Sequence, residues 1–259
     1  MVDLHSHILH GLDDGARTVE ESVEMVRLAV SCGTTDIVCT PHSNHEYAYN
    51  HALVAQRIED LERLTENSLR IHSGCDLHLS YNNIRDACEN SHKYSINGGS
   101  YLLVEFSDYL NIGSAYAMLA ELQNAGLRPI VTHPERNPVI AEHLDELAAW
   151  VDRGCFVQIT ALSLLGGFGG RVRRCCQTLI QTGLVHFVSS DGHDVIHRPP
   201  RLDLAKTWLQ DNYGAEYADL LVNLNPANVI NDQPISSGAQ RPPEVPKRWY
   251  QFWRNGARD

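Results

Sequence analysis

Side chains that can bind metal ions recur at defined places along this sequence. The 14 histidines outnumber phenylalanine and tryptophan together, and several of them stand close to carboxylates. His5 and His7 are two residues apart, as are Asp191 and His193, so an extended backbone points both members of each pair to one face. A set of imidazoles and carboxylates suits Mn, Fe or Zn better than Mg. These pairs therefore predict a metal site.

Each of these residues belongs to, or follows, a short run that is rich in valine or isoleucine. Seven such runs of four to six residues have the pattern of buried parallel strands. They cover residues 2–5, 36–40, 70–75, 101–105, 129–132, 155–160 and 185–190. The stretches between them read as helices, and a glycine ends four of these just before a strand. These glycines are Gly33, Gly126, Gly154 and Gly183.

Repeated βα units predict a parallel sheet whose faces are covered by helices. About seven units fit either an open doubly wound sheet or a (β/α) barrel close to the eight-stranded form. No GxGxxG sequence follows the first run, which weakens the dinucleotide-binding version of the open sheet. The glycine-rich residues 166–170 lack a following Lys-Ser/Thr, so we interpret them as a flexible loop and not as a phosphate-binding loop.

In parallel α/β folds, the carboxyl ends of the strands carry the active site. Six of the seven expected strands place a histidine or carboxylate there, whereas the run 155–160 offers nothing stronger than Thr160. The residues at this rim are His5, His7, His42, Asp76, Glu105, His133, Asp191 and His193. The first and last strands are neighbours in a closed barrel, so their residues would converge into a multi-metal site.

Some polar residues near the rim have simpler interpretations. Asp14 could be only a turn residue. The histidines that do not end a strand are expected to be structural or on the surface, and His10 and His45 are the ones closest in sequence to the site.

Composition limits the class of protein. The chain has 259 residues, a net charge of -11, 43% hydrophobic and 20% charged residues, which is ordinary for a globular protein. No window approaches the roughly 18 apolar residues of a membrane span, and the start lacks the features of a secretory signal. The acidic balance argues against nucleic-acid binding.

The seven cysteines are scattered without a CxxC pattern, which favours reduced thiols in a cytoplasmic protein. None of them has an arginine six residues later, as a thiolate phosphatase would need.

The final stretch, residues 231–259, differs in composition from the domain expected over residues 1–230. It is rich in proline and ends with basic and aromatic side chains at residues 247–254. We expect a tail that packs on the barrel or on a neighbouring subunit. A contact with a membrane surface or with a partner is the alternative.

Taken together, the segments of the rim resemble the polymerase-and-histidinol-phosphatase (PHP) superfamily. They are DLHSHIL at 3–9 with DDG at 13–15, TPH at 40–42, VEF at 104–106, THPER at 132–136 and SDGH at 190–193. Within that superfamily, the sequence is similar to the bacterial manganese-dependent protein-tyrosine phosphatases of capsular and exopolysaccharide operons. The resemblance covers about residues 1–230, and its most specific parts are the HxH–DDGA opening and the HPER segment.

The resemblance implies a single-domain, distorted (β/α)7 TIM-like barrel of the PHP fold, with up to three Mn²⁺ ions and with Fe or Zn as alternatives. One metal would take His5, His7 and Asp191, a second would take Glu105 and His133, and Asp76 would bridge them. A third would take Asp14, His42 and His193. Arg136 and Arg198 would bind the phosphate and act on it together with Asp191. The family usually has glutamate at the bridge, and Asp76 is one methylene shorter.

The implied activity is direct, metal-dependent hydrolysis of protein phosphotyrosine. The implied substrate is a bacterial tyrosine autokinase that controls capsule or exopolysaccharide synthesis. Three alternatives stay open: a histidinol-phosphate phosphatase, a PHP-type exonuclease, and a metal-binding module without turnover. Stable membrane insertion is not expected, and the oligomeric state is open.

Overall fold

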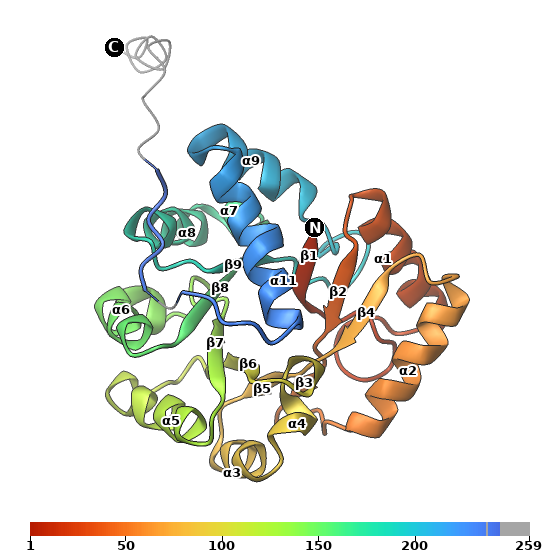
Figure 1. The fold of residues 1–259 in the computed structure, drawn as a ribbon, viewed down its shortest axis with the longest axis horizontal. Helices are drawn as coiled ribbons and strands as arrows, with labels where there is room; N and C mark the ends of the chain where they lie inside the picture. The colour runs from red at the N-terminus through yellow and green to blue at the C-terminus, as the bar shows by residue number, and fades with distance from the viewer. Residues whose placement is uncertain (237, 244–259) are drawn as a thin grey trace.

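A ring of short parallel strands, surrounded by helices, forms the centre of the protein (Figure 1). The computed structural model describes residues 1–236 and 238–243. The strands are β1 (Val2–Ser6), β2 (Asp36–Cys39), β3 (His42–Ser43), β4 (Arg70–Ser73), β5 (Asp76–His78), β6 (Tyr101–Glu105), β7 (Arg128–Thr132), β8 (Phe156–Thr160) and β9 (Phe187–Ser189). The longer helices are α1 (Val19–Ser31), α2 (His51–Leu64), α3 (Tyr81–Glu89), α5 (Ile112–Asn124), α6 (Leu144–Asp152), α8 (Gly170–Thr182) and α9 (Asp203–Tyr213). Shorter helical segments are α4 (Ser91–Tyr94), η1 (Ile96–Gly98), η2 (Ile140–Glu142), α7 (Ala161–Leu165), α10 (Ala215–Asp219), η3 (Leu220–Leu224) and α11 (Asn225–Ile230).

The strands form two parallel sheets, in the orders β1-β2-β4 and β3-β5-β6-β7-β8-β9. β3 continues the line of β2, and β5 continues that of β4, so the nine strands occupy seven positions. Hydrogen bonds also join β1 to the residues after β9: Asp191 N–H donates to His5 O (2.9 Å) and His7 N–H to Gly192 O (2.8 Å). The ring therefore closes, and the expectation of a distorted (β/α)7 barrel is confirmed.

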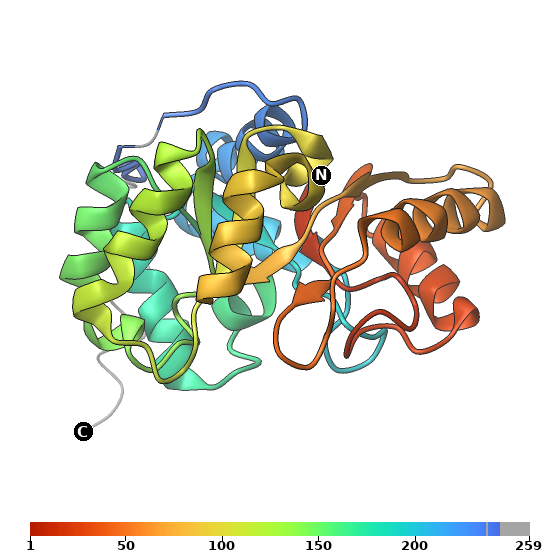
Figure 2. The same cartoon turned by 90° about the horizontal axis from the view of Figure 1, so that it is seen from below.

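The second and third strand positions are interrupted at the same level. β2 and β4 pair up to Cys39 and Ser73, and pairing resumes between β3 and β5 at His42 and Asp76. The strand expected over residues 70–75 therefore ends earlier, at Ser73. Gly74 lies at the break, where a Cβ would come within 2.8 Å of Val38 Cγ1, so only glycine allows this approach. Figure 2 shows α1 and α2 standing out on this side of the barrel.

The amino-terminal half of the barrel is filled with apolar side chains. This cluster contains Val2, Leu4, Val38, Ile96, Tyr101, Leu103, Ile130, Phe156, Phe187 and Val229. Val229 belongs to α11, which lies across the amino-terminal ends of the strands and covers the cluster (Figure 1). The polar residues of the strands therefore gather at the opposite, carboxyl-terminal end.

Four glycines end helices as expected. Their φ angles lie in the left-handed region, between +80° and +94°, which L side chains rarely adopt. They are Gly33, Gly126, Gly154 and Gly183.

The described part of the tail packs on the barrel. Gln240 N–H donates to Gly183 O at 2.6 Å, and Tyr217 Oη donates to Gln240 O at 3.2 Å. The basic and aromatic residues 247–254 lie outside the described residues. Within residues 1–236 and 238–243, no helix is both long and apolar enough to cross a bilayer.

Candidate metal centre

His5 and His7 reach the centre of the barrel through an irregularity in β1. Pairing with β2 passes from Asp3–Ile37 to Ser6–Cys39, so β1 uses three residues where β2 uses two. Such a β-bulge shifts the alternation of side chains by one position. His5 can therefore face the barrel interior directly after Leu4, which belongs to the apolar cluster there. His7 follows on the same face, as the two-residue spacing predicted.

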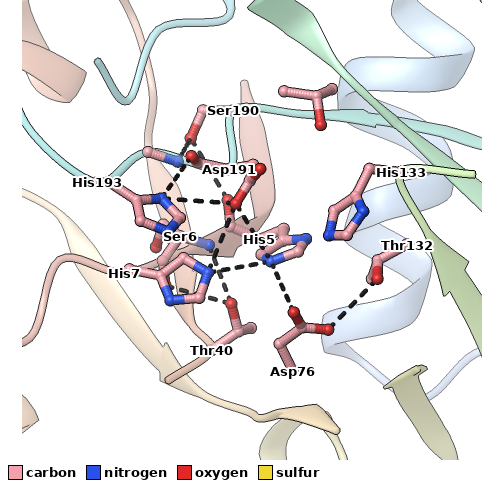
Figure 3. A network of polar contacts seen from close by, with 12 residues as sticks. His5, Ser6, His7, Thr40, Asp76, Thr132, His133, Ser190, Asp191 and His193 are labelled. Carbon is pink, nitrogen blue, oxygen red and sulfur yellow. Dashed lines mark hydrogen bonds and ion pairs between the residues drawn. The ribbon is translucent and has the colours of Figure 1, made fainter. Parts of the chain in front are cut away.

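The two imidazoles point their free nitrogens at each other. His5 Nε2 and His7 Nε2 are 3.2 Å apart (Figure 3). The other nitrogen of each ring is already engaged: His5 Nδ1 donates to Gln158 Oε1 at 3.0 Å, and His7 Nδ1 donates to Asp13 Oδ2 at 2.6 Å. Burial lowers the pKa of His7, but Asp13 and Asp191 outweigh burial and raise the pKa to about 10, so His7 carries a proton that a cation bound at Nε2 would displace. With both Nδ1 atoms engaged, the two Nε2 atoms are the positions left for a shared cation.

Asp191, which follows the neighbouring strand β9, completes this first group. Its Oδ1 lies 3.6 Å from His5 Nε2 and 3.5 Å from His7 Nε2. Burial raises the pKa of Asp191, but the neighbouring histidines and the guanidinium groups of Arg136 and Arg198 outweigh burial and hold the pKa well below its ordinary value. Asp191 is therefore a carboxylate at neutral pH.

A second group lies at the start of β5 and at the ends of β6 and β7. Asp76 Oδ2 stands 3.6 Å from His5 Nε2 and 3.3 Å from His42 Nδ1, and no hydrogen-bond donor of the described residues satisfies it. Glu105 Oε1 is 3.6 Å from His133 Nε2. Burial and nearby Arg136 lower the pKa of His133 to about 3, so this ring is neutral and free to act as a ligand.

A third group stands at the outer edge of the centre. Asp14 Oδ1 lies 3.5 Å from His42 Nε2 and 3.5 Å from His193 Nε2. His193 Nδ1 donates to Asp191 O at 2.9 Å, which leaves its Nε2 free. Burial and the charge of His7 lower the pKa of His193 to about 4. Asp14 thus belongs to the centre and is more than a turn residue. The ring of His42 lies between the third group and the second group.

The spacing of these atoms fits metal binding. Ligand atoms about 2.1 Å from one ion stand roughly 3.0–3.4 Å apart, and most distances in the three groups are close to this range. Three sets of side chains meet the geometry of a metal site: His7 with Asp14, His42 and His193; His5 with His7 and Asp76; and His42 with Asp76 and Glu105. Together with Asp13 and Asp191, five carboxylates meet here, which gives an excess of negative charge that metal cations would balance.

The backbone is strained at two of these residues. His133 and Asp191 have φ angles of +33° and +53°, which non-glycine residues rarely adopt. Each of them follows the end of a strand, β7 or β9, and the unusual angle accompanies a side chain that points into the centre (Figure 3). Such strain commonly marks functional sites.

Two arginines stand beside the metal groups. Arg198 Nη2 donates to Asp191 Oδ2 at 2.6 Å, and Arg136 Nη1 donates to the same oxygen. Each arginine side chain is about one quarter exposed, so a phosphate that enters from solvent can reach both. The ring of Phe168 covers them, with its centre 4.7 Å from Arg136 Cζ and 6.0 Å from Arg198 Cζ.

Sequence reasoning missed three residues of this site. Thr160 was the strongest candidate expected in residues 155–160, and that expectation overlooked Gln158, whose Oε1 accepts a hydrogen bond from His5 Nδ1. The alternation of side chains along a strand, which puts Gln158 on the same face as Thr160, could have indicated it. Asp13 was passed over in favour of its neighbour Asp14. Phe168 lies in the glycine-rich segment, which links α7 to α8.

Two other histidines near the site in sequence lie outside the three groups: His45 is exposed beside Glu46, and His10 lines a separate cavity with Arg57 and Asp60. His78 differs from the expectation of a structural or surface residue, because its Nδ1 lies 3.9 Å from Glu105 Oε2 in the second group. All seven cysteines are free thiols, in agreement with the expectation from their number and spacing.

Comparison with known proteins points to one family. A family model described as capsular polysaccharide synthesis, CpsB/CapC, matches residues 1–231. The tyrosine-protein phosphatase YwqE of Bacillus subtilis (strain 168) is 32% identical over 252 residues, which cover 96% of this chain and 97% of that protein.

Solved structures agree with this relationship. One of them comes from work on YwqE from Bacillus subtilis and CpsB from Streptococcus pneumoniae, described as unique metal-dependent tyrosine phosphatases. It has a TM-score of 0.84 and 31% identity, and covers 95% of this chain and 100% of its own. The histidinol phosphate phosphatase of Lactococcus lactis shares the fold alone, with a TM-score of 0.57 and 12% identity over 85% of this chain and 94% of its own.

Proposed function

The chain belongs to the CpsB/CapC family of capsular polysaccharide synthesis proteins, and from this premise we propose that it is a metal-dependent phosphatase that hydrolyses phosphotyrosine in proteins. One observation carries the proposal. Asp191 connects the metal-binding histidines to the two arginines. Its Oδ1 faces His5 and His7, while its Oδ2 accepts hydrogen bonds from Arg136 and Arg198. A phosphate held by the arginines would thus lie next to the metal ligands.

The donor set supports up to three metal ions. We assign His5, His7 and Asp191 to the first, Glu105 and His133 to the second, and Asp14, His42 and His193 to the third. Asp76 would bridge the first two. Mixed imidazole and carboxylate donors favour Mn²⁺, with Fe or Zn as alternatives. When bound, such ions activate water at neutral pH and neutralise the charge of the phosphoryl group.

The protein side chains bind and orient the substrate. Arg136 and Arg198 hold the phosphoryl oxygens through their planar guanidinium groups. A tyrosine leaving group departs as a phenolate of pKa about 10, and therefore needs less protonation than the alkoxide of serine would. The lower need for protonation favours an aryl phosphate as the substrate, because its hydrolysis does not require a general acid next to the leaving oxygen.

A cysteine nucleophile is not part of this mechanism. Burial raises the pKa of Cys175 to about 11 and that of Cys155 to about 12, so these thiols are protonated at neutral pH. Activity should therefore survive treatment with a thiol-blocking reagent.

We further propose that the substrate protein is a bacterial tyrosine autokinase in the cytoplasm and that its dephosphorylation controls capsule or exopolysaccharide synthesis. The family description and the phosphatase names of the relatives support this assignment. The alternatives are weaker: the likeness to histidinol phosphate phosphatase extends to the fold alone, and a net charge of -11 disfavours an exonuclease.

The test measures hydrolysis of three substrates by the Mn-loaded protein: phosphate release from a phosphotyrosine peptide and from histidinol phosphate, and nucleotide release from a single-stranded oligonucleotide. We expect turnover of the peptide, loss of turnover with a chelator and recovery with Mn²⁺. Preference for histidinol phosphate would instead identify an enzyme of small-molecule metabolism.

A further inference from the structure

A cavity of about 390 Å³ lies next to the metal centre, between the segment that follows β7 and the first turns of α8. We propose that this cavity binds acidic side chains that flank the phosphotyrosine, so that the enzyme selects acidic phosphotyrosine segments of its substrate. This inference rests on the proposed function and deepens it. A cavity of this size is large enough for one or two side chains and has the volume of an ordinary ligand pocket.

The lining of the cavity combines basic and apolar side chains. Arg171 and Arg174 line it from α8, where they share one helix face with Cys175 and Thr178. Pro138, Ala141, Leu144 and Val172 contribute apolar surface to the same lining. Such a lining suits a carboxylate on a short aliphatic stem, because the guanidinium groups pair with the charge while the apolar side chains contact the methylene groups.

The local charge differs in sign from that of the whole chain. The protein carries a net charge of -11, yet three arginines, Arg136, Arg171 and Arg174, border this one cavity. Two acidic residues oppose them. Glu142 pairs with Arg171 at 2.7 Å, but both side chains are more than 60% exposed, so the pair is weak and exchangeable. Glu135 is buried, and its Oε1 accepts the Thr160 N–H at 3.0 Å, which directs that oxygen into the protein.

Arg136 connects the cavity to the metal centre. Its guanidinium group donates to Asp191 on one side, while the residue also lines the cavity. Consecutive residues of an extended peptide are about 3.3–3.6 Å apart. The residues one or two positions from the phosphotyrosine therefore lie only a short distance from it along the peptide. A peptide whose phosphate is bound by Arg136 therefore places the residues beside the phosphotyrosine next to this cavity.

The test compares peptides that differ only beside the phosphotyrosine. One carries glutamate on both flanks and the other carries glutamine, and each contains a non-hydrolysable phosphonate in place of the phosphate. Dissociation constants are measured by fluorescence anisotropy on the metal-loaded, full-length protein. We expect roughly tenfold tighter binding of the acidic peptide, as two partly exposed ion pairs would give. Arg171→Gln/Arg174→Gln should remove that preference.

A matched control lies on the same helix. Arg173 does not line the cavity, and its side chain lies against Gly166 instead. Arg173→Gln should keep the preference for the acidic peptide. Equal affinity of the wild-type protein for both peptides, or an equal loss in Arg173→Gln, would overturn the inference.

The proposed function is judged separately. Hydrolysis of p-nitrophenyl phosphate, which has no flanking residues, reports on catalysis alone. Absence of that hydrolysis in the metal-loaded protein would count against the phosphatase, whereas the binding ratio of the two phosphonate peptides decides the role of the cavity in either case.

Discussion

His5 Nε2 and His7 Nε2 face each other at 3.2 Å, while Gln158 and Asp13 hold the opposite nitrogen of each ring. Hydrogen bonds at the Nδ1 atoms fix the orientation of both rings and direct their Nε2 atoms to one point. Asp191 and Asp76 approach the same point with carboxylate oxygens. The side chains that hold the outer nitrogens should therefore control how tightly the centre binds metal.

Replacement of Asp13 tests this control. Its Oδ2 accepts hydrogen bonds from His7 Nδ1 and from the His42 N–H. We expect Asp13→Ala to weaken Mn²⁺ binding by about 10–100-fold, as is typical when the partner of a metal-binding histidine is lost. Asp13→Asn, which keeps an acceptor oxygen, should lose less. Competition with a fluorescent chelator measures the affinity, and the exposed Asp152→Ala provides the control. Equal affinity of all variants would contradict the role of Asp13.

Asp76 offers a test of the proposed bridge. Related phosphatases are expected to carry glutamate there, but Asp76 already reaches both His5 and His42 and is fully buried. An added methylene group would overpack the site, so Asp76→Glu should lower stability by about 1–3 kcal/mol without improving metal affinity. Asp76→Asn should lower the metal content. Chemical denaturation and elemental analysis check both; a gain in affinity for Asp76→Glu would show that the aspartate is a suboptimal bridge.

Phe168 should support the two arginines. Its ring covers both guanidinium groups, and such contacts contribute about 0.5–2 kcal/mol. We expect Phe168→Ala to reduce kcat/KM for a phosphotyrosine peptide by roughly 3–30-fold, and inhibition by inorganic phosphate to weaken in parallel. Phe168→Tyr should preserve both properties, while Phe168→Leu separates ring stacking from simple apolar volume. Unchanged phosphate inhibition in Phe168→Ala would exclude this support.

Stability should depend on pH through Asp36 at the start of β2. Its carboxylate accepts two hydrogen bonds of 2.6 Å from Arg70 and one of 3.1 Å from His72. Burial raises the pKa of Asp36, but these partners lower it more, to about 2. Because the folded pKa lies below the unfolded value of about 3.9, the stabilisation is complete above about pH 5 and is lost progressively as pH falls towards 2.

Asp36→Asn removes this titration. The difference in free energy of unfolding between the wild type and Asp36→Asn should therefore shrink between pH 6 and pH 3. Urea denaturation of both proteins measures this difference. A chelator is present throughout, so that the metal ligands titrate in the same way in both proteins. A difference that stays constant over this range would contradict the assignment.

Much of the barrel could be predicted from the sequence. The seven runs rich in valine and isoleucine became the seven strand positions, because buried parallel strands need continuous apolar segments. The polar residues at their ends met at one rim for the same topological reason. The break at Gly74 was not predictable, since it depends on the distance to Val38, a contact between strands that are far apart in sequence.

The details of the centre also depend on three-dimensional contacts. The bulge that turns His5 inward is a property of pairing between β1 and β2, and a single strand does not reveal it. Gln158 has no distinctive motif, and its role follows only from its distance to His5 across the barrel. Phe168 lies among glycines that indicate a loop, but the sequence does not show where that loop lies in the fold.

The most direct test of the account is to remove both histidines of the first group and measure metal content and phosphotyrosine hydrolysis on the same samples. The control is His45→Ala/His92→Ala, which alters two exposed histidines, and thermal unfolding verifies that each variant is folded. We predict that His5→Ala/His7→Ala loses at least one bound Mn²⁺ and at least about a thousandfold in turnover, while the control keeps both. Full turnover by the folded His5→Ala/His7→Ala protein would contradict a metal centre at this end of the barrel.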